Sequence, residues 1–355
     1  MDWLHWVAFS LFIIVFVFGM VLAFIWLERR GMARLQVRPG PNRAGPLGLL
    51  QPVADAIKIL LKEDIVPDRG DRLLHFLAPI VAFFPALLVF AVVPFFSFDG
   101  EQRGLVPDLN IGLVYLVAVS SISIVGVFTA GWASNNKYSL MGAMRTMAQM
   151  VSYEVPLVLA LVGVALVSGS LSLVRIVDAQ SALPFILLQP LGFLVYFTAA
   201  IAELNRTPFD LLEAESEIVA GYHTEYSGMK FAMFYLGEYA HVLGMAAVTT
   251  TLFLGGWRGA LLPPLLWFLI KVFAVFLVIV WVRATLPRLR VDQLMGFAWK
   301  FLLPLALINI FLVAVEGLWA APSLWILVVI NFGVAVALIL LFSRLWRLGG
   351  GRVGA

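Results

Sequence analysis

The stretch WLHWVAFSLFIIVFVFGMVLAFIWL, residues 3–27, contains no Asp, Glu, Lys or Arg. An α-helix rises about 1.5 Å per residue and the hydrocarbon core of a bilayer is about 30 Å thick, so about 20 apolar residues can cross it. The stretch therefore predicts a transmembrane helix. Its apolar length continues to Leu27 without an A-x-A-like cleavage site, which is typical of a retained anchor and not of a removable signal peptide.

Eight more apolar runs of similar length follow along the chain: 73–96, 110–132, 145–168, 184–204, 231–256, 265–285, 299–318 and 322–343. Their continuous apolar character excludes a membrane barrel, whose strands alternate. The last two runs are separated only by residues 320–322, but a single helix covering both would be far too long for one bilayer. We expect an all-α integral membrane protein with about nine transmembrane helices, forming one domain over residues 1–355.

The composition supports this class. Hydrophobic residues make up 62% of the 355 residues and charged residues 13%, whereas soluble domains have about 45–50% and about 25%. A water-soluble domain, a disordered chain and a nucleic-acid-binding module are excluded. The chain has no cysteine and only four scattered histidines, so thiolate-held zinc or iron–sulfur centres are excluded and a bis-histidine haem is disfavoured. We expect no bound metal.

Basic residues predict the orientation, because cytoplasmic loops are enriched in Lys and Arg. If the N-terminus lies outside the cytoplasm, cytoplasmic segments hold 20 of the 24 basic residues, and outer loops hold only Arg103, Arg175 and Arg258. This split favours an odd number of spans, with the N-terminus outside and the C-terminus in the cytoplasm.

The first inner loop, 28–72, begins with prolines and glycines that prevent a helix. From Leu50 onward, apolar residues recur at three- and four-residue steps, while Gln51, Asp55, Lys58 and Lys62 occupy the other face. This pattern predicts an amphipathic helix in the membrane interface. It can be a simple surface anchor, or it can roof a cavity that opens to lipid.

The second inner region, 205–230, is acidic. Thr207 and Pro208 suit the cap and first turn of a short helix. On such a helix Asp210, Glu213 and Glu217 share one face and Glu215 points elsewhere. Neighbouring carboxylates repel one another, so they are expected to share protons with coupled, raised pKa values. The alternative is an ordinary solvated acidic face.

Three glutamates fall within predicted spans: Glu154 in the fourth, Glu203 at the end of the fifth and Glu238 in the sixth. An ionisable side chain inside a span costs at least about 2.5–3.5 kcal/mol and is by default a functional candidate. Together with the acidic loop they predict a proton relay, against the alternative of isolated structural hydrogen bonds. We expect Lys271 and Glu316 to reach the interface, and His75 and His241 to serve packing.

Four segments resemble one known family, and the resemblance extends from the first span to the eighth. They are LERRGMARLQVRPGPNRAGPLGLLQPVADAIKILLKED (27–64), AMRTMAQMVSYEVP (143–156), AELNRTPFDLLEAESEIVAGYHTEY (202–226) and WVRATLPRLRVDQLMGFAWKFLLP (281–304). The family is that of the H subunits of proton-translocating NADH:quinone oxidoreductase, respiratory complex I. Its members usually have eight spans, so the run at 322–343 is additional.

The resemblance implies a membrane subunit at the base of the soluble arm, which carries flavin and iron–sulfur clusters. Such a subunit forms most of the entry tunnel for ubiquinone or menaquinone and couples quinone reduction to antiporter-like subunits. The implied quinone-binding residues are Glu28, Arg29, Arg38, Asp55, Phe231 and Arg283. The implied coupling residues are Glu154, Glu203, Arg206, Asp210, Glu213, Glu215, Glu217, Glu225 and Glu238.

The same resemblance implies no catalytic residue, redox centre or covalently bound cofactor in the chain itself, with quinone as the substrate of the whole translocase. The implied location is the bacterial inner membrane. The implied partners are the other subunits of the complex, both soluble iron–sulfur subunits and small or antiporter-like membrane subunits, and the lipid bilayer, but no nucleic acid. Within the tunnel we expect Arg38 to pair with Asp55, because an unpaired charge there would be costly.

Three alternatives remain. One is the equivalent anchor subunit of a membrane-bound hydrogenase or of a dehydrogenase fed by ferredoxin or F420. Another is a stand-alone ion transporter, which the lack of inverted repeats disfavours. The third is a purely structural anchor, which explains the inner loops but not the buried glutamates.

Overall fold

The computed structural model describes residues 3–95, 108–211, 219–259, 262–318 and 323–350. Over this part of the chain the protein is helical and has no strand, so the predicted all-α class is confirmed. Eight of its helical segments are long and apolar enough to cross a membrane. They are α1 (Trp3–Leu35), α3 (Arg72–Val89), α4 (Gly112–Ala133), α5 (Lys137–Ser168), α10 (Gly228–Phe253), α11 (Pro264–Thr285), the continuous segment Val291–Leu318, which contains α12 (Val291–Phe297) and α13 (Leu303–Leu318), and α14 (Leu324–Gly350).

The fifth predicted span is broken in the structure. It forms α7 (Phe185–Leu188) and α8 (Pro190–Glu203), which is shorter than the other spans. Gln189 between them has φ −129° and ψ 63°, outside the helical region. Pro190 has no backbone N–H to continue the hydrogen-bond ladder, and it disfavours a helical residue before it, so the break falls where the sequence places a proline.

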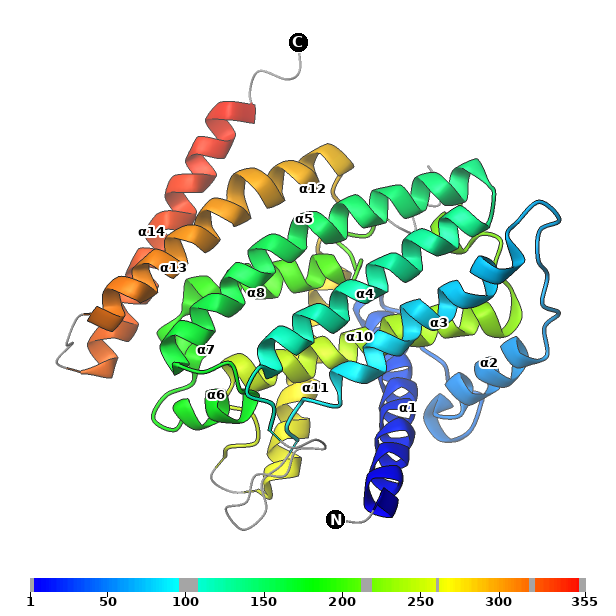
Figure 1. Cartoon of the computed structure of the whole chain (residues 1–355), viewed down its shortest axis with the longest axis horizontal. Helices are drawn as coiled ribbons and strands as arrows, with labels where there is room; N and C mark the ends of the chain where they lie inside the picture. Colours follow the sequence, from blue (N-terminus) through cyan, green and yellow to red (C-terminus); the bar gives the residue numbers. More distant parts are fainter. Residues whose placement is uncertain (1–2, 96–107, 212–218, 260–261, 319–322, 351–355) are drawn as a thin grey trace.

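The first helix ends at Leu35 and not near Leu27. Glu28 and Arg29 therefore lie on α1 and not in a loop. The predicted amphipathic helix is present as α2 (Gln51–Leu60), with Pro52 in its first turn and with Val53, Ile57 and Leu60 exposed. It packs beside α1 and α10 at one edge of the molecule (Figure 1).

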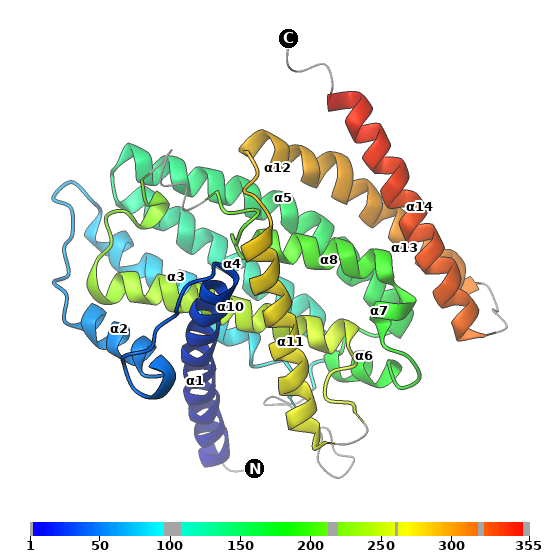
Figure 2. The ribbon, with the colours of Figure 1, turned by 180° about the vertical axis from the view of Figure 1, so that it is seen from behind.

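The tilted helices α3, α4, α5, α8 and α10 form the centre of the molecule (Figure 1). Two further helices, α1 and α11, pack against α10, whereas α13 and α14 lie along the opposite flank (Figure 2). The helix α14 contacts α7 and α8, so it covers the break in the fifth span. The start of α1 and the end of α14 lie on opposite sides of the molecule (Figures 1 and 2).

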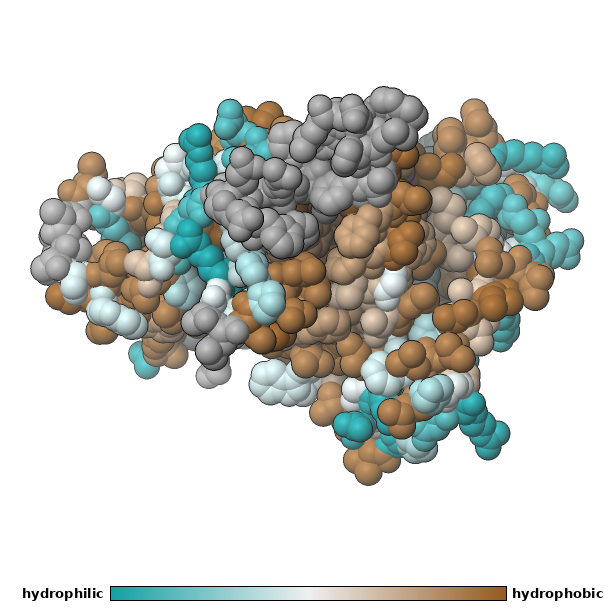
Figure 3. Space-filling model, turned by 90° about the horizontal axis from the view of Figure 1, so that it is seen from below, coloured by the Kyte–Doolittle hydropathy of each residue, from teal (hydrophilic) through white to brown (hydrophobic). Residues whose placement is uncertain are grey.

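Much of the surface is apolar. Hydrophobic side chains cover a broad area in Figure 3, and residues such as Leu11, Val15 and Val329 are more than half exposed. Apolar area of this extent is unfavourable in water by about 25 cal/mol per Å². It is the surface that a lipid bilayer covers, so the chain is a multi-pass membrane protein.

Both charged residues expected near span ends have partners. Lys271 Nζ donates to the carbonyls of Leu254, Gly256 and Arg258 at 2.7, 2.9 and 2.8 Å, at the end of α10. Glu316 accepts from Asn331 Nδ2 of α14 at 3.2 Å, and the same amide donates to the Leu188 carbonyl at 2.6 Å. Asn331 therefore ties α14 to α13 and to the end of α7.

Candidate functional site

A non-helical segment follows α8 and places a charged side chain inside the helix bundle. Residues 204–211 form turns, with a cis peptide bond between Thr207 and Pro208. The predicted short helix capped by Thr207 is therefore wrong for this part of the chain. Gln149 of α5 donates to the carbonyls of Ala202 and Phe209 at 2.7 and 2.8 Å. The backbone N–H of Leu289 donates to the Pro208 carbonyl at 3.0 Å. Because buried carbonyls need donors, these bonds hold the segment without a helical ladder.

Arg206 is the residue of this segment whose charged side chain lies inside the bundle. Its side chain is 5% exposed. Its Nη1 donates to Glu28 Oε1 on α1 at 3.0 Å, and its Nε lies 2.9 Å from Glu238 Oε1 on α10. The guanidinium also lies over the Tyr239 ring, 4.6 Å from its centroid. Burial opposes the charged form of Arg206, but the carboxylates of Glu238 and Glu28 outweigh it and raise the pKa of the guanidinium.

Arg283 of α11 completes the group by pairing with Glu28. Two arginines and two glutamates, Glu28, Arg206, Glu238 and Arg283, thus form one charge-balanced assembly, which we name the Arg206 cluster. Four parts of the chain far apart in sequence contribute to it. Buried charges are stable only when paired in this way. Glu28 and Arg283 are two of the residues that the resemblance implies for quinone binding. Arg206 and Glu238 are two of those that it implies for coupling, so the cluster contains members of both sets.

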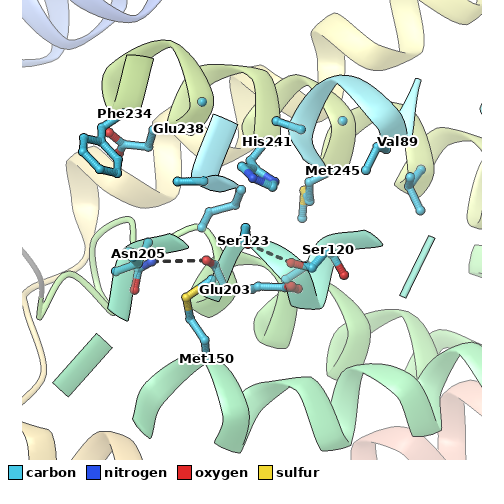
Figure 4. A pocket seen from close by; sticks show the side chains of 18 of the residues that line it. Val89, Ser120, Ser123, Met150, Glu203, Asn205, Phe234, Glu238, His241 and Met245 are labelled. Carbon is cyan, nitrogen blue, oxygen red and sulfur yellow. Dashed lines mark hydrogen bonds between the residues drawn. The ribbon is translucent and has the colours of Figure 1, made fainter. Parts of the chain in front are cut away.

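A cavity of about 160 Å³ lies beside the Arg206 cluster and shares Glu238 with it. Side chains of α3, α4, α5, α8, α10 and the short helix η2 (Gly221–His223) line it. Its wall is mostly apolar, and Phe231 belongs to it. Figure 4 shows Glu238 and His241 on one side, with Glu203 and the serines of α4 facing them. The cavity therefore brings Glu203 and Glu238 to one space.

Glu154 and Glu203 are neighbours. Glu154 of α5 accepts a hydrogen bond from Ser121 of α4. Glu203 of α8 is close enough for its charge to interact with that of Glu154, and it hydrogen-bonds with Ser120. The structure thus places these two predicted relay residues together, with a serine of α4 beside each.

The remaining acids of the second inner region have separate partners. Asp210 is paired with Arg288 at 2.7 Å, and Glu225 accepts from Asn136, the residue before α5, at 2.6 Å. Neither lines the cavity. Glu213, Glu215 and Glu217 lie outside the described residues.

Next to Glu225, the ring of His75 stacks on Tyr226 with centroids 4.0 Å apart. Lys230 links this pair to the first inner loop through Asp64, at 2.9 Å. Half-buried His223, at the end of η2, also lines the cavity. Burial lowers the pKa of His223 to about 4, so the ring is neutral at pH 7.

The pair that joins α1 to α2 differs from the expected one. Asp55 binds Arg29, and Gln51 Nε2 donates to its other oxygen at 2.9 Å. The ion-pair partner of Asp55 is thus Arg29, whereas Arg38 is exposed, so the predicted pairing of Arg38 with Asp55 is wrong. Burial raises the pKa of Asp55, but the hydrogen bonds from Arg29 and Gln51 outweigh it, and the pKa lies below its ordinary value. Arg29 is one helical position past Glu28 and therefore reaches outward to α2.

Sequence reasoning missed several partners: Ser121, Asn136, Arg288 and the cation-binding ring of Tyr239. Two of them could have been found from the sequence, because Arg288 lies within the segment 281–304 and Tyr239 follows Glu238 directly. Ser121 is one of several serines in apolar spans, and Asn136 stands in a short loop. Nothing in the sequence pairs them with particular acids.

Comparison with known proteins gives the family. The family model described as NADH dehydrogenase matches residues 8–314. A curated relative from Dehalococcoides mccartyi, named as the H subunit of NADH-quinone oxidoreductase, is 61% identical over 353 residues, covering 99% of this chain and 98% of the relative. Relatives with that name from Brevibacillus brevis and, as H subunit 2, from Syntrophobacter fumaroxidans are 54% and 52% identical over 86% and 87% of this chain and 91% and 95% of their own lengths. The chain therefore belongs to the NADH dehydrogenase family, among the membrane proteins related to the H subunit of NADH-quinone oxidoreductase.

Proposed function

We propose that this chain is the membrane subunit of a proton-translocating NADH:quinone oxidoreductase in which quinone enters and its reduction is coupled to proton movement. The subunit supplies no redox centre, and electrons come from the soluble partner subunits. The names of its relatives favour quinone as the substrate over the hydrogenase-type alternative.

One observation carries the proposal: the Arg206 cluster connects the two sets of residues. Glu28 is paired with Arg283 and with Arg206, and Arg206 is paired with Glu238, which lines the cavity. Interaction between charges inside a protein is strong because the effective dielectric constant is low. Negative charge on a reduced quinone near α1 would therefore change the proton affinity of Glu238 through Arg206.

The chain's own groups then have distinct tasks. Arg29 and Asp55 hold α2 against α1 at the proposed entrance for quinone. Arg206 passes a change of charge from the α1 side to the α10 side without itself losing a proton. Glu238, Glu203 and Glu154 hold or release protons around the cavity. Such a local charge change can bias a two-state element of the complex.

The test is a pair of neutralising changes, Glu203→Gln and Glu238→Gln, in the assembled complex in native membranes. We expect NADH:quinone reductase activity to fall, or to continue with a lower proton-to-electron ratio. Glu316→Gln is the matched control, because Glu316 is also a partly buried acid in a span but lies on α13, bonded to Asn331. Assembled variants with normal turnover and a normal ratio would contradict the coupling role.

A further inference from the structure

His241 has no task in the scheme above, yet it stands in the cavity. It lies on α10 three residues after Glu238, so both side chains project from the same face of the helix. Figure 4 shows the ring of His241 between Glu238 and the α4 serines near Glu203. The sequence alone suggested a packing role for this residue.

One nitrogen of the His241 ring is hydrogen-bonded, and the other has no hydrogen-bond partner among the described residues. The imidazole hydrogen-bonds to the backbone carbonyl of Ala82 on α3. Nε2 is buried and has no hydrogen-bond partner within the described part of the chain. Nδ1 is therefore the donor to Ala82, and the neutral ring exposes the basic lone pair of Nε2. An unpartnered buried polar atom is destabilising, so packing alone does not account for a histidine here.

The side chains that line the cavity around His241 include groups that can give and take a proton. Lining the same cavity are Tyr196 and Glu203 of α8, Tyr222 and His223 of η2, and Tyr235 and Glu238 of α10. The lining side chains of α3, α4 and α5 are not titratable. Glu203 and Glu238 are thus the only carboxyl groups among the described residues of this wall, and they stand on opposite sides of the cavity (Figure 4).

We propose that His241 carries a proton between Glu238 and Glu203. Glu238, which is a carboxylate when paired with Arg206, first takes up a proton when quinone reduction changes the charge of the cluster. Its protonated carboxyl then gives this proton to Nε2, which leaves a carboxylate and an imidazolium. Nε2–H then gives the proton to the carboxylate of Glu203, and the ring returns to its neutral form. Nδ1–H stays on the Ala82 carbonyl throughout, and the net change is one proton moved from Glu238 to Glu203.

Two features of the structure support this path. Arg206 lies beside Glu238 and stabilises the carboxylate that the first step creates. The cavity of about 160 Å³ is larger than the roughly 10–15 Å³ that one water requires, so water can complete either hydrogen-bonded contact. The proposal rests on the proposed function, because it adds a carrier to that proton path.

The experiment replaces His241 in the assembled complex in native membranes. His241→Asn keeps an amide donor near the position of Nδ1 but removes Nε2, and His241→Gln places an amide that binds no proton near Nε2. We expect both variants to assemble and to lose at least about 100-fold in pumping-coupled quinone reductase rate, the low end of what a positioned acid–base group contributes.

Two further readouts separate a proton carrier from a packing residue. The solvent deuterium isotope effect on turnover should increase in both variants, and their pH profiles should lose the limb that the titration of His241 sets in the wild type. A merely structural histidine would change neither. Normal rate, isotope effect and pH profile in either variant would overturn the proposal, as would failure of both variants to assemble.

Glu238→Gln, measured beside them, keeps the two proposals distinguishable. If Glu238→Gln uncouples the complex and the His241 variants do not, only the carrier role of His241 fails. If Glu238→Gln itself leaves coupling intact, the proposed function fails and the path through His241 fails with it.

Discussion

At the scale of single residues, the site depends on one arginine that the fold buries almost completely. Glu28 has a side chain only 5% exposed and is paired with Arg206 and Arg283, whereas Glu238 is 31% exposed. The members of the Arg206 cluster are therefore interdependent. A change at one member affects stability through the charge that it leaves behind.

Arg206→Met should destabilise the subunit by about 3–5 kcal/mol, because it leaves the cluster with an uncompensated negative charge. Arg206→Met combined with Glu238→Gln restores neutrality and should recover part of that loss. Arg258→Met is the control: its pair with Asp178 is more than a third exposed on both sides, and such pairs contribute about 0–1 kcal/mol. Thermal unfolding midpoints of the detergent-solubilised complex measure all three, and a double variant no more stable than the single one contradicts the argument.

The lowered pKa of His223 predicts that the free energy of unfolding depends on pH. Its pKa is about 4 in the folded protein, against an ordinary value of 6.5. The unfolded chain therefore binds the proton first, so this contribution to stability is fully present above pH 6.5 and is lost as the pH falls towards 4. Between pH 7 and pH 5 the loss amounts to about 2 kcal/mol.

His223→Phe should remove this acid-side loss, because phenylalanine does not titrate and also suits the aromatic contacts of His223 with Tyr222 and Phe231. Unfolding midpoints at pH 7 and pH 5 measure the difference between wild type and variant. An equal drop in both proteins would assign the acid sensitivity to other groups.

At the scale of helices, close backbone contacts hold the central bundle together. A Cβ atom added at Gly126 of α4 would lie 2.4 Å from the backbone nitrogen of Ala82 on α3, which is too short for any real contact. In membranes, small residues permit helices to approach in this way. The contact also positions Ala82, whose carbonyl binds His241.

Gly126→Ala should therefore force α3 and α4 apart and destabilise the subunit by about 1–3 kcal/mol, as overpacked cores do. Gly19→Ala on α1 is the matched control, because an added Cβ there meets nothing within 4 Å. The yield of assembled complex and its unfolding midpoint provide the comparison. Equal values for the two variants would show that the α3–α4 contact can relax freely.

The position of the last helix, α14, depends on one polar residue, Asn331. The family model ends at residue 314, before α14, whereas the relative from Dehalococcoides mccartyi aligns over 99% of the chain. Asn331 fixes α14 to the carbonyl of Leu188, beside the break at Pro190. An apolar helix without such a bond has little preference among apolar neighbours in a membrane.

At the scale of the whole molecule, orientation in the membrane is the remaining prediction. Because the chain has no cysteine, a single introduced cysteine reports its side of the membrane without background from this chain. Lys137 begins α5, and Arg175 follows the end of that span on α6 (Leu173–Ala179); both are exposed. Lys137→Cys should react with an impermeant maleimide from the cytoplasmic side, and Arg175→Cys from the outer side. The predicted orientation has the N-terminus outside the cytoplasm. The opposite labelling pattern would contradict it.

The sequence by itself determined the class, the approximate spans, the amphipathic helix and the family, because apolar length, charge bias and long motifs are local properties of the chain. It also marked Glu154, Glu203 and Glu238 as unusual, since ionisable groups in spans are costly wherever they end up. Helix ends were less predictable: α1 continues past Leu27 because arginines can extend a helix beyond the apolar core.

Only the tertiary structure decided which charges meet. Glu28 and Arg206 are 178 residues apart, and Arg283 is 255 residues from Glu28. Their pairing depends on how α1, α10 and α11 pack around the 204–211 segment, and so does the choice of Arg29 over Arg38 as partner of Asp55. Ion pairs depend on distance in space, which residue order does not specify, so the Arg206 cluster, the cavity and the open nitrogen of His241 belong to the fold and not to any one segment.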